Sequence, residues 1–198
     1  LIDTKDLQSD LKNLRVFDAS RNNNNFYGNP FLYHFQFKNL LKCHREGGKT
    51  IYDVYNDKTQ WDKLLEETRK RNRGGRTAAG NVFECFRINL GSVVMFKSTT
   101  AKYLYQKYRA KSVLDPTAGW GGRMLGAWAL DIDYTGIDTN TELKPAYDKM
   151  IEFLDKENTF DSNLFEAENS KLQMIWQSCL DVDFSKIDYD FVLTSPPY

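Results

Sequence analysis

The stretch of sequence that decides the fold reads Val113-Leu114-Asp115-Pro116-Thr117-Ala118-Gly119-Trp120-Gly121-Gly122-Arg123. An apolar run leads into an acidic residue and then into a glycine-rich turn, a pattern typical of a strand that is followed by a helix. In an open parallel sheet, ligands bind beyond the carboxyl ends of the strands, and glycines let a ligand approach the backbone closely. The stretch therefore predicts a parallel sheet with a ligand site at one edge.

The turn does not match the dinucleotide fingerprint GxGxxG. After Gly119 and Gly121, the third glycine position is occupied by Met124. A carboxylate at Asp115 would also repel a pyrophosphate, whereas it suits a ligand that carries an ammonium group. The residues favour a different nucleotide-like ligand.

A second acidic residue, Asp138, ends a predicted strand at residues 134–137. At that place a carboxylate accepts hydrogen bonds from the hydroxyls of a ribose. An amino acid joined to a nucleoside satisfies both Asp115 and Asp138, and S-adenosylmethionine is such a ligand. The alternative is that both aspartates simply cap unrelated turns.

Strands and helices alternate on both sides of this turn. Short apolar runs predict strands at residues 112–114, 134–137, 173–177 and 189–194. Apolar residues at helical spacing predict helices at residues 99–108, 124–129 and 144–154. Strands that alternate with helices pair in parallel, so the sequence predicts an α/β fold with helices on both faces of the sheet.

The first part of the chain, residues 1–76, is predicted to be an extension to a core at residues 77–198. Leu7, Leu11 and Leu14 have helical spacing, and residues 22–25 form an asparagine run typical of a loop. Alternating aromatic residues predict a half-buried strand at 31–37, with base-stacking rings as the alternative. A short amphipathic helix is predicted around Trp61, Leu64 and Leu65, and a strand or buried segment at 82–88. 

The chain ends on Ser195-Pro196-Pro197-Tyr198, directly after the last predicted strand. A proline pair can merely end a strand, because proline donates no backbone hydrogen bond. Following Asp115 and Asp138 in this order, however, the tetrapeptide resembles the catalytic loop of the S-adenosylmethionine-dependent amino-methyltransferases of DNA. Their cofactor turn, Asp-Pro-x-x-Gly-x-Gly, corresponds to residues 115–121. The resemblance covers about residues 96–198.

This resemblance implies a Rossmann-like class I methyltransferase sheet, of which the chain carries the first four strands. Further strands are then expected from a C-terminal segment or a second chain, because the fourth strand would otherwise have a bare edge. The implied cofactor is S-adenosyl-L-methionine. The resemblance assigns its binding to Asp115, Pro116, Ala118, Gly119, Gly121 and Asp138, to Phe96, Lys97, Ser98 and Thr99, and to Ser178 and Cys179.

The implied chemistry is methylation of an exocyclic amino group, whose lone pair is delocalised into the base. The Ser195 side chain and the Pro196 carbonyl would accept hydrogen bonds from the amino group and favour the tetrahedral nitrogen that attacks. Pro197 would hold the loop rigid, and Tyr198 would stack on the flipped base. The target stays open between adenine N6 and cytosine N4. Alternatives are RNA or a protein glutamine as substrate, or a non-catalytic subunit that needs a partner.

The composition is that of a soluble globular protein, with 41% hydrophobic and 27% charged residues. The net charge of zero argues against a wholly basic nucleic-acid-binding protein. A local basic segment is the predicted DNA contact, with a solvated helix end as the alternative; it consists of Arg69, Lys70, Arg71, Arg73 and Arg76.

Three widely spaced cysteines and two histidines predict neither a disulfide framework nor a metal site. No apolar run is long enough to cross a bilayer, and the first residues do not resemble a signal peptide. We therefore expect no membrane association. The expected location is the cytoplasm, bacterial or of a virus-infected host, or the nucleus of a eukaryotic cell.

Overall fold

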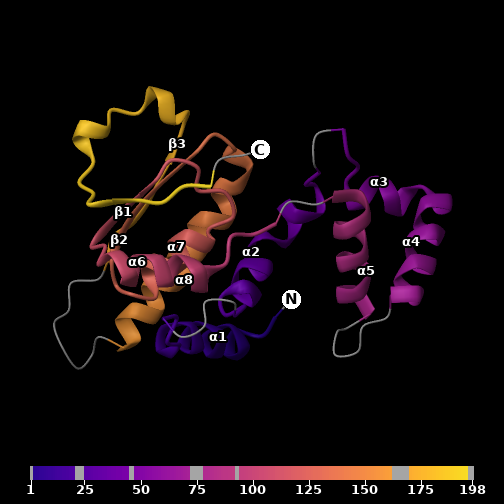
Figure 1. Ribbon diagram of the computed structural model, residues 1–198, viewed down its shortest axis with the longest axis horizontal. Coiled ribbons are helices and arrows are strands. Elements are labelled where there is room, and N and C mark those ends of the chain that lie inside the picture. Colours follow the sequence, from indigo (N-terminus) through magenta and orange to yellow (C-terminus); the bar gives the residue numbers. More distant parts are fainter. Residues whose placement is uncertain are drawn as a thin grey trace. The chain divides into compact units, whose positions relative to one another are not determined.

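The structure is a computed structural model that describes residues 2–20, 25–44, 47–71, 78–91, 94–161 and 170–195. The chain divides into two compact units (Figure 1). The first consists of Leu1–Gln36 together with Met95–Tyr198, and the second of Phe37–Val94. These bounds differ from the predicted segments 1–76 and 77–198, because the first helices belong to the same unit as the sheet.

The first unit contains a parallel sheet of four strands in the order β3-β2-β1-β4. The strands are β1 (Ser112–Asp115), β2 (Asp133–Asp138), β3 (Leu172–Trp176) and β4 (Phe191–Val192). The predicted α/β fold with a parallel sheet is confirmed. The fourth strand is shorter than the predicted range 189–194, although the backbone N–H groups of Asp190 and Leu193, on either side of it, still donate to the carbonyls of Ser112 and Leu114.

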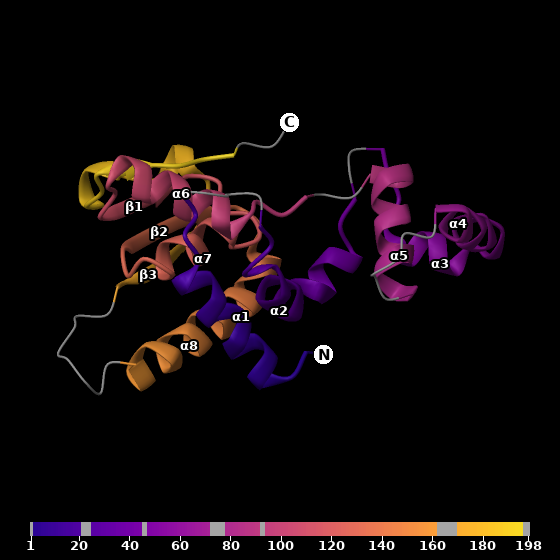
Figure 2. The same cartoon turned by 60° about the horizontal axis from the view of Figure 1, so that its bottom comes forward.

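Helices that alternate with these strands flank the sheet (Figure 2). They are α6 (Ser98–Tyr108), α7 (Gly122–Trp128) and α8 (Lys144–Asp161); α6 and α7 are close to the predicted ranges, whereas α8 continues beyond the predicted end at residue 154. Val113 and Ile137 of the strands and Leu125 and Met150 of the helices are fully buried. Removing this apolar surface from water supplies the main stabilisation of the unit.

The helix α1 (Thr4–Val16), predicted from its leucine spacing, is tied to α6 by a buried lysine. The ammonium group of Lys102 donates to the carbonyl oxygens of Leu14, Arg15 and Phe17 at 2.7 to 2.9 Å. Carbonyls at the end of a helix have no partner within the helix and attract a cation. Together with the hydrogen bonds of Arg15 to Asp131 and Asn158, this contact joins the start of the chain to the sheet unit.

The predicted strand at 31–37 is wrong, because these residues lie in the helix α2 (Asn29–Leu41). Phe31 and Phe35 are one helical turn apart, with ring centroids separated by 4.8 Å, and both rings pack near Phe153 of α8. Tyr33 and Phe37 are exposed on the helix. The alternation of aromatic residues therefore did not reflect a period-two strand.

The described residues of the second unit form helices joined by short turns, with no strand, and include α3 (Ile51–Asn56), α4 (Lys58–Arg71) and α5 (Ala78–Phe86). The predicted helix around Trp61 is confirmed by α4. The strand considered for residues 82–88 is wrong, because α5 and the π-helix Arg87–Gly91 cover that range. Val54, Leu64, Cys85 and Phe86 form a small core of their own.

Across the described ranges, no helix combines the length and the apolar character that a bilayer crossing requires.

Candidate active site

The candidate site lies at the carboxyl ends of the strands in the first unit. The chain passes from β1 to β2 on one side of the sheet, and β4 returns on the other side of β1. The carboxyl ends of β1 and β4 therefore flank a topological switch point, where open α/β sheets bind ligands. The predicted cofactor turn follows β1, and Ser195 follows β4.

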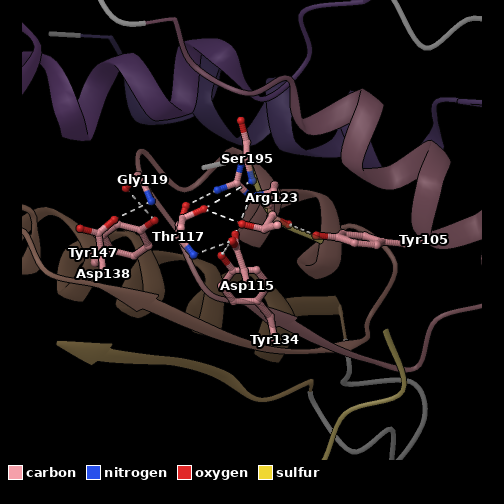
Figure 3. A network of polar contacts seen from close by, with 10 residues as sticks. Tyr105, Asp115, Thr117, Gly119, Arg123, Tyr134, Asp138, Tyr147 and Ser195 are labelled. Carbon is pink, nitrogen blue, oxygen red and sulfur yellow. Dashed lines mark hydrogen bonds and ion pairs between the residues drawn. The ribbon is translucent and has the colours of Figure 1, made fainter. Parts of the chain in front are cut away.

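Asp115 is fully buried and its carboxylate is engaged by the protein (Figure 3). Arg123 Nε and the Tyr134 hydroxyl each donate to Oδ2 at 2.6 Å, and the backbone N–H of Thr117 donates to Oδ1 at 3.2 Å. Burial raises the pKa of the Asp115 carboxyl, although the ion pair with Arg123 and the Tyr134 hydrogen bond favour its charged form. We predicted a direct contact between Asp115 and an ammonium group of a ligand. In the structure the buried carboxylate instead binds Arg123, Tyr134 and the backbone of the turn.

Arg123 completes this arrangement from the first turn of α7. Its guanidinium also donates to the backbone carbonyl of Thr117, and its charged group lies 5.0 Å from the centre of the Phe96 ring. Arg123 and Tyr134 were missed by the sequence reasoning. An arginine in the first turn of a helix that is otherwise apolar was the available signal, because a buried cation needs a buried partner.

The glycines let the turn pack against the chain around it. Gly121 has φ of +92°, in the left-handed region that side chains rarely adopt. A Cβ atom on Gly122 would lie 2.0 Å from the carbonyl oxygen of Phe96. The segment that precedes α6 therefore lies directly against the first residues of α7.

Asp138 holds the other side of the turn and keeps acceptor capacity. Its Oδ2 accepts the N–H of Gly119 at 2.7 Å, and its Oδ1 accepts the N–H of Asn140 at 2.8 Å. The Tyr147 hydroxyl donates to the carbonyl of Gly119 at 3.0 Å. Asp138 is only half-buried, and each carboxylate oxygen accepts more than one hydrogen bond. The carboxylate can therefore also accept hydroxyl groups of a ligand.

The turn after β1 contacts the loop after β4 through Thr117. Its hydroxyl lies 2.8 Å from the hydroxyl of Thr194, and the N–H of Ser195 donates to it at 3.4 Å. The structure thus brings the start of the Ser195 loop to the predicted cofactor turn. Pro196, Pro197 and Tyr198 lie outside the described residues.

The remaining predicted cofactor residues have varied surroundings. Phe96 and Lys97 are half-buried, whereas Ser98 and Thr99 are buried at the start of α6. The Thr99 hydroxyl donates to the carbonyl of Asn25 at 2.9 Å. Ser178 accepts the N–H of Leu180 with its side chain, just ahead of a short 3-10 helix, Cys179–Asp181.

The backbone of the turn also joins it to β2. The N–H of Ala118 donates to the carbonyl of Ile137 at 2.8 Å, and Pro116 begins the turn after the strand.

The predicted DNA contacts belong to the other unit, where Arg69, Lys70 and Arg71 are exposed at the end of α4. Arg73 and Arg76 lie outside the described residues.

Comparisons of the chain with models of known families, with curated proteins and with solved structures find no match. What the site can do follows from its own geometry and chemistry.

Proposed function

We propose that this chain binds S-adenosylmethionine at the carboxyl edge of its sheet and takes part in methylating an exocyclic amino group of adenine or cytosine in DNA. The observation that carries the proposal is the contact of Thr117 with Thr194 and Ser195. It joins the turn that resembles a cofactor site to the loop that resembles an amino-methylating site, at the switch point of the sheet.

Asp138 is the residue that best fits the nucleoside part of the cofactor. Its carboxylate is fixed by the N–H groups of Gly119 and Asn140, so it would meet two ribose hydroxyls without reorganising. Asp115, by contrast, would act indirectly. It binds Arg123 and the N–H of Thr117 and so fixes the backbone conformation of the turn that would contact the cofactor.

The cofactor supplies the methyl group, and the chain would supply acceptors for the amino group. The Ser195 side chain and the Pro196 carbonyl would accept its N–H groups and favour a tetrahedral nitrogen with a localised lone pair. Thr117 would help to keep Ser195 in place through the contacts already described. Tyr198 would stack on the target base.

The cofactor proposal is tested by calorimetry with S-adenosylhomocysteine and with its analogue that lacks both ribose hydroxyls. Loss of the hydroxyls should weaken binding to the unaltered chain at least about tenfold, since hydrogen bonds to charged groups contribute about 1.5–3 kcal/mol. Asp138→Ala should weaken binding of the parent ligand and should bind both ligands almost equally. If removal of the ribose hydroxyls weakened binding by the same factor in the unaltered chain and in Asp138→Ala, Asp138 would not contact the ribose.

Asp133→Ala is the matched control for this experiment. Asp133 lies at the opposite end of β2, and its carboxylate likewise accepts a backbone hydrogen bond, from the N–H of Lys171 at 2.8 Å. Its loss should leave the ligand affinity unchanged. Failure of the folded chain to bind either ligand would overturn the cofactor proposal.

The methyl-transfer proposal is tested by mass spectrometry of nucleosides from DNA incubated with the protein and cofactor. N6-methyladenine or N4-methylcytosine identifies the target base. Ser195→Ala should lower the turnover and leave the cofactor affinity unchanged, because the Ser195 side chain is assigned to the amino group.

A further inference from the structure

Positive charge is concentrated in the second compact unit, Phe37–Val94. This segment contains twelve Lys and Arg residues and seven Asp and Glu residues, whereas the rest of the chain contains fifteen and twenty. The zero net charge of the whole chain thus combines a basic unit with an acidic one. A basic unit of this size attracts polyanions.

The basic side chains of this unit are largely at the surface. Three basic residues of this unit form an ion pair with an acidic residue close by in the sequence. Lys58 pairs with Asp62 and Lys70 with Glu66 within α4, and Arg87 pairs with Glu84 of α5. Lys42, Lys63 and Arg69 are exposed and form no ion pair within the described residues. Their charge is available to an external anion.

The same unit carries an apolar hollow with exposed aromatic rings. Tyr52 and Tyr55 are 49% and 61% exposed, and the Tyr55 ring lies edge-on to Trp61 at 5.0 Å. The hollow is lined by Leu41, Ile51, Tyr52, Tyr55 and Trp61. Exposed rings and exposed cations on one unit are the combination with which proteins bind unpaired nucleic acid, since bases stack on rings and phosphates contact the charges.

We propose that the unit Phe37–Val94 binds single-stranded nucleic acid. Lys42, Lys63 and Arg69 contact phosphates, and Tyr52 at the hollow stacks on a base. This inference rests on the proposed function in one respect, because it names the unit that holds the nucleic-acid substrate. The binding itself needs neither the cofactor nor methyl transfer, so it is measured separately.

The charge contacts are tested by fluorescence anisotropy with a labelled DNA strand of about 20 nucleotides, longer than one single-strand site. Between about 50 and 200 mM NaCl, the logarithm of the binding constant should fall linearly with the logarithm of the salt concentration. The double variant Lys63→Gln with Arg69→Gln should lower this slope by about 1.4, or about 0.7 per lost phosphate contact. Its affinity at low salt should fall about tenfold.

The matched control is the double variant Lys12→Gln with Lys149→Gln. Both lysines are exposed in the first unit, and the same net charge is removed. We expect its affinity and salt slope to equal those of the unaltered chain. Equal effects of the two double variants, or no salt-dependent binding at all, would overturn the assignment to the second unit.

The stacking contact is tested with Tyr52→Ala. The affinity for the single strand should fall about fivefold or more, with an unchanged salt slope because no charge is lost. A duplex that binds as tightly as the single strand, with no effect of Tyr52→Ala, would overturn the single-strand proposal. Asp138→Ala should leave DNA affinity unaltered, which separates a failure here from a failure of the cofactor proposal.

Discussion

The side-chain hydroxyls of Thr117 and Thr194 lie 2.8 Å apart, although the two residues are separated by 77 positions in the chain. Each residue follows a strand of the sheet, β1 or β4, and these strands are direct neighbours. Thr117 is also held by the N–H bond to Asp115 and by Arg123 at its carbonyl. The candidate catalytic loop is thus joined to a turn whose conformation is fixed by a buried ion pair.

Replacement of Thr117 should show how strongly this contact joins the two loops. Thr117→Val removes the hydroxyl at similar volume, and the free energy of unfolding should fall by about 1 kcal/mol. Thr194→Val should have a similar effect. The double variant should lose about 0.5–1 kcal/mol less than the sum of the two single variants, since both single changes break the same hydrogen bond between Thr117 and Thr194. Urea unfolding measures all three, and strict additivity would contradict the contact. Thr117→Ser keeps the hydroxyl and serves as the control.

Gly122→Ala should disrupt the packing of the turn against the segment before α6. The added Cβ would lie 2.0 Å from the Phe96 carbonyl oxygen, and backbone atoms cannot rotate away as a side chain does. We expect a loss of about 3 kcal/mol in the free energy of unfolding. Gly119→Ala is the comparison, because its Cβ would meet only the Thr117 carbonyl at 3.8 Å. Its left-handed φ of +60° predicts a smaller loss of about 1 kcal/mol. A Gly122 variant no less stable than the Gly119 variant would contradict the close approach.

Lys102→Met should weaken the attachment of α1 to the sheet unit. Methionine keeps the apolar stem but leaves three carbonyls at the end of α1 without their donor. A loss of about 2–3 kcal/mol is expected, measured by urea unfolding followed by circular dichroism. Lys149→Met, at an exposed position of α8, should change the stability by less than about 0.5 kcal/mol. Similar losses in both variants would show that the capping contact contributes nothing specific.

Stability should fall at alkaline pH because of buried tyrosines. Burial raises the pKa of Tyr134 well above its ordinary value of 10.0, and the nearby Asp115 carboxylate adds to the shift. Above pH 10 the unfolded chain releases this proton while the folded chain keeps it, so unfolding becomes more favourable as the pH rises. Each such group adds about 1.4 kcal/mol per pH unit to the loss.

Tyr134→Phe tests this pH dependence. At neutral pH the variant should be about 1 kcal/mol less stable, since it lacks the hydrogen bond to Asp115. Between pH 10 and pH 11 its stability should decline less steeply than that of the unaltered chain. Urea unfolding at several pH values measures both effects, and parallel pH curves would contradict the assignment.

The sequence predicted the elements around the turn after β1 well, because local signals agreed there. The apolar run at 113–114, the glycines at 119, 121 and 122 and the helical spacing that follows are all short-range features. The alternating aromatics from Phe31 to Phe37 failed as a signal, since Phe31 and Phe35 lie as well on one face of a helix. In the helix both rings pack near Phe153, which is distant in the sequence, so this contact could not be read from the local pattern.

The sequence by itself determined the α/β order of elements, the turn after β1 and the acidic residue that ends β2, because each depends on residues close together in the chain. Only the tertiary structure decided that Asp115 faces Arg123 and Tyr134, that Thr117 meets Thr194, and that basic residues gather in a separate unit. The physical reason is that these relationships join residues far apart in the sequence. Which buried charges pair and which strands lie side by side depends on packing across the whole chain.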